Sequence, residues 1–116
     1  MTDTTYKNGQ VSFTMGGTEY TVLPNVKAIL AIEQATGKPI LQVGMEAMSL
    51  GLTINATVLY QALRANGVKE LSFEDVAEAM LEDMQSKEQA LFKASLAFLN
   101  GIFPKVEPTG GKPKSA

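Results

Sequence analysis

The sequence predicts an α+β fold in which an N-terminal β-hairpin packs on a bundle of about four or five α-helices. Apolar residues alternate with polar ones over residues 11–22, on both sides of a Gly-Gly pair, which is the period of a β-strand. After Pro24 they recur every three or four residues, which is the period of an α-helix. We therefore expect a flexible arm over residues 1–10, one α+β domain over residues 11–103 and a flexible, disordered tail over residues 104–116.

The hairpin is expected first, with its tight turn at Gly16-Gly17, because glycine readily adopts the positive φ that such turns need. An isolated hairpin is marginal in water, so one of its faces must lie on apolar surface. The next segment, residues 26–36, lies between the N-cap Asn25 and Gly37 and is apolar on most of its circumference. We expect this helix to be central and to lie under the hairpin, with coverage by a partner as the alternative.

Two shorter helices are expected next, over residues 40 to about 50 and 55–65, the second closed by Asn66-Gly67. Ser72 is a strong N-cap, and Glu74 and Asp75 follow it in the first turn, where the helix dipole favours acids. Residues 73–100 contain no Pro and no Gly, so they form either one long helix or two helices that join near Ser86.

Composition excludes several function classes. The chain has 116 residues, a net charge of −2 and a pI near 5.1, which disfavours binding to nucleic acid. It contains no His and no Cys, so the commonest general base and metal ligands are missing. We expect no enzymatic activity, no cofactor and no metal. Without a secretory signal or an apolar run of ~20 residues, we expect a cytoplasmic protein that does not enter a membrane.

Acidic residues recur at every fourth position over Glu70, Glu74, Glu78 and Glu82. A cation site and a pair of catalytic carboxylates are the functional interpretations of this row. A helical row cannot wrap an ion as a calcium loop does, so we favour a solvated face that can steer a basic partner.

Two apolar patterns are candidate contact surfaces. The first is a set of methionines spaced as on helix faces: Met45, Met48, Met80 and Met84. We favour core packing for these side chains, with a peptide-binding surface as the alternative. The last helix is apolar on one side and carries small residues on the other, so partner binding, self-association and core packing all remain open. The candidate partner-binding residues are Leu91, Phe92, Leu96, Phe98, Leu99, Ile102 and Phe103.

Taken in order, these elements resemble the tail assembly chaperones of long-tailed phages, in particular the branch found in gene transfer agents. The resemblance covers roughly Val11 to Leu81. It is carried by the segments Glu19 to Leu23, Ala31 to Glu33, Thr36 to Ile40, Leu59 to Gly67 and Ser72 to Val76. The chain departs from that branch in its added last helix and basic tail.

The resemblance implies a helper protein that coats the helical tape measure protein, helps to recruit the tail tube protein and is absent from the mature virion. A homo-oligomer is a further expectation. The alternatives are a head–tail joining or tube-capping protein of the virion and, less favoured, a helical DNA-binding regulator. The resemblance also implies a longer form made by ribosomal slippage, for which residues 110–112 can be encoded by a slippery run, although an ordinary tail is favoured.

Overall fold

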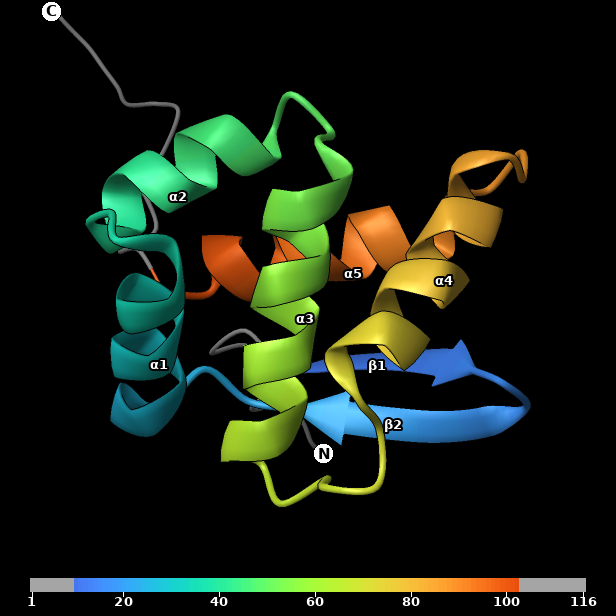
Figure 1. The fold of residues 1–116 in the computed structure, drawn as a ribbon, viewed down its shortest axis with the longest axis horizontal. Helices are drawn as coiled ribbons and strands as arrows, with labels where there is room; N and C mark the ends of the chain where they lie inside the picture. Colours follow the sequence, from blue (N-terminus) through green and yellow to red (C-terminus); the bar gives the residue numbers. More distant parts are fainter. Residues whose placement is uncertain (1–9, 103–116) are drawn as a thin grey trace, which may run out of the picture.

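The computed structural model describes residues 10–102. Over these residues a two-stranded antiparallel hairpin is followed by five helices, which confirms the predicted α+β fold (Figure 1). The elements are β1 (Val11–Met15), β2 (Thr18–Val22), α1 (Val26–Thr36), α2 (Ile40–Ala47), α3 (Leu52–Ala65), α4 (Phe73–Met84) and α5 (Ala90–Asn100). The predictions for Phe103, for the tail and for nearly all of the N-terminal arm lie outside the described residues.

The hairpin turns at the Gly-Gly pair, as predicted. Val11 pairs with Val22 and Met15 with Thr18, and Gly16 and Gly17 have φ of 59° and 84°. Positive φ at both central residues is the signature of a type I′ turn, whose twist matches that of the strands. The inward side chains of β1 are buried, and β1 packs against α5 rather than α1.

The central helix is α3. It packs against α1, α2, α4, α5 and β2 (Figure 1), and its buried side chains include Val58, Leu59 and Leu63. The expectation that α1 is central was wrong, because α1 buries only Ala28 and Ile32 and lies at the side of α3. A helix that is apolar on most sides does not indicate which side faces the core.

Local capping signals set most helix boundaries. The Asn25 side chain accepts a hydrogen bond from the backbone N–H of Ala28 at 2.8 Å and begins α1. Gly37, with φ of 70°, ends it. Ser72 and Asp75 form a reciprocal capping box at the start of α4.

Residues 73–100 form two helices. The connection over residues 85–89 ends at Gln89, whose φ of 49° is in the left-handed region. The carboxylate of Asp83, in the last turn of α4, accepts hydrogen bonds from the backbone N–H groups of Leu91 at 3.0 Å and Phe92 at 3.1 Å. The N-cap residue Gln89 makes no side-chain capping hydrogen bond, so Asp83 caps the start of α5 from the preceding helix.

Candidate functional site

The structure places most of the predicted partner-binding residues of α5 in the protein's own core. Leu91, Phe92, Phe98 and Leu99 are buried, which corrects the expectation that they form an accessible contact surface. Their apolar partners are other elements of the same chain, chiefly β1, α3 and α4. Among the other predicted residues, Leu96 and Ile102 are partly buried against this core, and Phe103 lies outside the described residues.

A more accessible apolar surface lies on α2. This helix turns Val43 and Ala47 into the core, whereas Leu41, Met45 and Met48 are 60%, 63% and 70% exposed. The three exposed residues follow one another at i, i+4 and i+7, so they form a single stripe on the helix. Exposed stripes of this kind are normally polar, and large exposed apolar surfaces mark interaction sites.

The stripe borders a groove between α2 and α5, which we call the α2–α5 groove. Its volume is about 340 Å³. It is lined by Leu41, Gly44, Met45, Met48, Leu96, Leu99 and Asn100. None of these side chains carries a charge, and Asn100 is the one polar residue among them, so the groove suits an apolar occupant.

The sequence-based predictions found part of this groove. Leu96 and Leu99 belong to the predicted partner-binding set, and Met45 and Met48 to the methionine pattern for which core packing was favoured. The other two methionines differ: Met80 is buried in the core, and Met84 is 37% exposed on α4. Leu41 was missed, although its spacing from Met45 and Met48, opposite Val43 and Ala47, is a signal that the sequence carries.

Both ends of α2 are held by side-chain hydrogen bonds. At its start, the carboxylate of Glu33 on α1 accepts a hydrogen bond from the backbone N–H of Ile40 at 2.7 Å. After its end, the buried side chain of Asn55 donates to the backbone carbonyls of Ala47 and Gly51. These contacts fix α2 against α1 and α3, and hence fix one wall of the groove.

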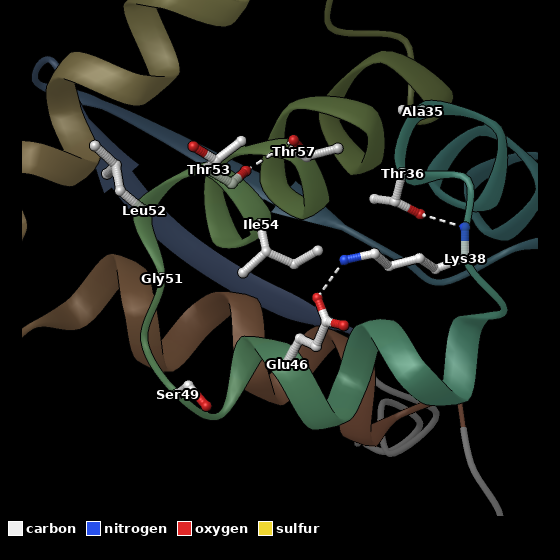
Figure 2. Close-up of a pocket in the computed structure, with 10 residues that line it drawn as sticks. All are labelled: Ala35, Thr36, Lys38, Glu46, Ser49, Gly51, Leu52, Thr53, Ile54 and Thr57. Carbon is white, nitrogen blue, oxygen red and sulfur yellow. Dashed lines mark hydrogen bonds and ion pairs between the residues drawn. The ribbon is translucent and has the colours of Figure 1, made fainter.

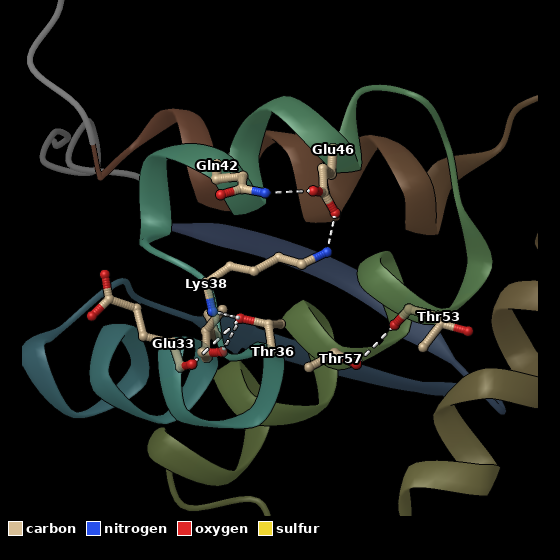
Figure 3. A network of polar contacts seen from close by, with 8 residues as sticks. Glu33, Thr36, Lys38, Gln42, Glu46, Thr53 and Thr57 are labelled. Carbon is tan, nitrogen blue, oxygen red and sulfur yellow. Dashed lines mark hydrogen bonds and ion pairs between the residues drawn. The ribbon is translucent and has the colours of Figure 1, made fainter.

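A second depression lies where α1, α2 and α3 meet (Figure 2). It is open and lined by both polar and apolar residues, with a volume of about 600 Å³, and an ion pair between Lys38 and Glu46 crosses it (Figure 3). The Thr36 and Thr57 hydroxyls donate to carbonyls of their own helices, each at 2.8 Å. The side chains of Lys38, Glu46, Thr36 and Thr57 thus have partners within the chain.

The partners of Glu46 in this network lower the pKa of its carboxyl group. The Lys38 ammonium and then the Gln42 side-chain amide, both hydrogen-bonded to the Glu46 carboxylate, hold its pKa below the usual 4.5. The side chains of Lys38 and Glu46 each remain 38% exposed. The pair therefore acts as a surface brace between α2 and the α1–α2 turn.

The acidic row of α4 lies on the surface. Glu74, Glu78 and Glu82 are exposed, whereas Asp75 and Asp83 serve as caps. Within residues 10–102 no group of three His, Cys, Asp or Glu side chains is placed to hold a metal ion. The row therefore has the geometry of a solvated helix face.

Comparisons with protein-family models, with curated proteins and with solved structures give no match for this chain. Among the described helices, none combines the length and the apolar character that a membrane crossing requires.

Proposed function

We propose that this protein is a binding protein of the tail assembly chaperone type, which holds an apolar helical segment of a tape measure protein in the α2–α5 groove. The observation that supports this proposal is the exposed stripe of Leu41, Met45 and Met48 beside that groove. Helix-in-groove recognition uses anchors spaced at i, i+3, i+4 and i+7 on the bound helix.

The shape of the groove favours a helix as the occupant. Two packed helices leave a furrow between them that the side-chain ridge of a third helix can fill. Gly44 lines the groove and has no side chain, so it leaves room for an approaching helix. The uncharged lining excludes occupants that present charge, because burying a charge without a partner is strongly unfavourable.

The methionines suit a long client whose sequence varies along its length. Methionine is unbranched and polarisable, so its side chain adapts to different apolar surfaces. Met45 and Met48 both lie on the exposed stripe. The resemblance to the chaperone family supplies the identity of the client, and it also supplies the second proposed partner, the tail tube protein.

The experiment is co-expression with a long, helical, tape-measure-like open reading frame from the same genome region. The native chain should keep that product soluble and co-purify with it, whereas Met45→Glu combined with Met48→Glu should lose both effects. The matched control is Leu81→Glu, which alters an exposed apolar residue on α4. Loss of solubility with the control as well, or recovery of the protein from purified particles as a permanent component, would contradict the proposal.

Gly44→Leu separates binding from folding. Leucine favours a helix over glycine by up to about 1 kcal/mol, so the variant should melt at the same or a higher temperature. Its new side chain projects into the groove lining and should weaken client binding. A variant that is more stable and yet binds as well as the native chain would rule out the groove as the binding site.

A further inference from the structure

We propose that this protein associates with copies of itself when no partner is bound, with α1 of one copy lying in the α2–α5 groove of the next copy. A partner that binds in the groove would then displace the neighbouring copy. The self-association stands apart from the proposed function, whereas its displacement by a client rests on that function.

The most exposed apolar side chains are concentrated on two helices. Among residues 10–102, five large apolar side chains are more than half exposed, with exposed fractions between 59% and 71%. Three of them, Leu41, Met45 and Met48, form the stripe beside the groove, and the other two, Val26 and Leu30, lie on α1. Exposed apolar surface of this kind marks a contact with another protein. A single contact between α1 and the groove covers both places.

The exposed face of α1 has the pattern of a helix that binds in a groove. Val26 and Leu30 are four residues apart, so they are neighbours on one face of the helix. Leu23, just before the helix, precedes Val26 by three residues and is 44% exposed. Helices that bind in apolar grooves carry anchors at such i, i+3 and i+7 spacings. Lys27 is the one charged residue at an exposed position of α1, and it lies beside this stripe.

The rest of the chain holds α1 rigidly for such a contact. On the inward side of the helix, Ala28 and Ile32 are fully buried. The Asn66 side chain donates a hydrogen bond to the backbone carbonyl of Leu23 at 3.0 Å and accepts one from its N–H at 3.1 Å. These bonds fix the segment before α1 against the end of α3. A helix that is formed and fixed in advance loses little conformational freedom on binding.

The groove offers the complementary surface. Its lining carries no charge and its volume is about 340 Å³, so the apolar ridge of a helix can enter it without burying a charge. No residue of α1 lines the groove of its own copy. Because α1 is packed against α3, on the side opposite α4 (Figure 1), the helix that fills the groove must come from a second copy.

The contact joins two different surfaces, so it is heterologous. Each pair of copies keeps one free α1 and one free groove, to which further copies can add. The five exposed side chains contribute apolar area on the order of 300 Å². A stable interface buries at least about 1,200 Å² in total, so this contact is weak and reversible. A client with a larger apolar surface therefore displaces it.

Sedimentation velocity of the full chain over a range of concentrations tests the contact. The native chain should form species larger than a dimer as its concentration rises. Leu30→Glu on α1 and Leu41→Glu beside the groove should each remain monomeric and keep the native melting temperature, because the native side chains are 59% and 60% exposed. The control Leu81→Glu, at a position on α4 that is 48% exposed, should assemble like the native chain.

An equimolar mixture of Leu30→Glu and Leu41→Glu tests which surfaces meet. The first variant keeps an intact groove and the second keeps an intact α1. The mixture should therefore form a heterodimer with one native contact and nothing larger. Its Kd should match that of the native contact within about twofold, because each substitution lies on the surface that the heterodimer does not use.

Three results would overturn the proposal. One is a native chain that stays monomeric up to about 1 mM. The second is assembly of Leu30→Glu alone to the same extent as the native chain. The third is a mixture in which the two variants do not associate, because α1 of one copy would then not bind the groove of another.

Addition of a tape-measure segment separates this inference from the proposed function. If both are right, the segment should dissociate the native assemblies into complexes with one copy each. Binding of the segment that leaves the assemblies intact would contradict the inference alone, and association of the mixed variants without any binding of the segment would contradict the proposed function alone. At concentrations below that of self-association the groove is free, so Leu30→Glu should leave the affinity for the segment unchanged.

Discussion

The Ser95 hydroxyl donates a hydrogen bond to Oδ1 of Asn55 at 2.7 Å, and both side chains are fully buried. The Asn55 amide nitrogen donates to the carbonyls of Ala47 at 3.1 Å and Gly51 at 2.9 Å. One buried amide thus joins the end of α2, the start of α3 and the middle of α5. Because a buried polar group is stabilising only when it is hydrogen-bonded, this network selects one arrangement of the two helices that form the α2–α5 groove.

Removal of Asn55 should be severe. Asn55→Ala leaves the Ser95 hydroxyl and two carbonyls without this partner and should lower the free energy of unfolding by about 3–5 kcal/mol. Ser95→Ala removes one hydrogen bond and should lower it by about 1–2 kcal/mol. Urea denaturation followed by circular dichroism measures both, and the double variant should lose less than the sum. A loss below 1 kcal/mol for Asn55→Ala would show that the network makes little net contribution.

Asp83 should stabilise α5 although it belongs to α4. Asp83→Ala removes the acceptor for two backbone N–H groups and should lower stability by about 1–2 kcal/mol, as for the loss of an N-cap. The matched control is Glu82→Ala, an exposed neighbour, which should change stability by less than about 0.5 kcal/mol. Equal effects in thermal melts would show that charge, and not capping, accounts for the loss.

Leu50 adopts a backbone conformation that disfavours its side chain. Its φ is 64°, and it lies in the turn between α2 and α3. In this left-handed region a non-glycine residue costs about 1–2 kcal/mol. Glycine avoids that cost, but it loses more backbone entropy on folding, so its net advantage is smaller. Leu50→Gly should therefore be about 1 kcal/mol more stable than Leu50→Ala, which loses the same side chain but keeps the strain. Equal stability of the two variants would contradict the strain.

The Lys38–Glu46 pair predicts a dependence of stability on pH. Because the pKa of Glu46 is depressed in the folded state, its contribution is present above pH 4.5 and is lost as the pH falls through the folded-state pKa. Glu46→Gln should be less stable than the native chain near neutral pH, and the difference should shrink below pH 4.5. Denaturation curves of both proteins at pH values on either side of 4.5 test this prediction. A difference in stability that does not change with pH would show that ionisation of Glu46 does not contribute to stability.

Local signals in the sequence predicted the fold well. The Gly-Gly turn and the caps at Asn25, Gly37 and Ser72 depend on residues within a few positions of each other, so a short segment contains the whole cause. The sequence could not decide between one long helix and two helices over residues 73–100. Residues 85–89 lack Gly and Pro, and Gln89 adopts its left-handed conformation only in the folded context. The capping of α5 by Asp83 likewise depends on tertiary structure.

The candidate site was harder to predict. Periodicity indicates that a helix has an apolar face, but not whether that face contacts the same chain or another protein. For this reason Phe98 was assigned to a contact surface although it lies in the core, and Leu41 was not singled out although it is exposed. The distinction follows only from the packing of α3 and the hairpin around α5.

The most direct test of the account compares two leucines of equal exposure. Leu41 beside the groove is 60% exposed and Leu30 on α1 is 59% exposed, so glutamate should be tolerated equally by the fold at either position. Calorimetric titration with a tape-measure segment should show at least about tenfold weaker binding, or 1.4 kcal/mol, for Leu41→Glu and little change for Leu30→Glu. Equal weakening by both substitutions, or weakening by Leu30→Glu alone, would contradict the assignment of the α2–α5 groove as the binding site.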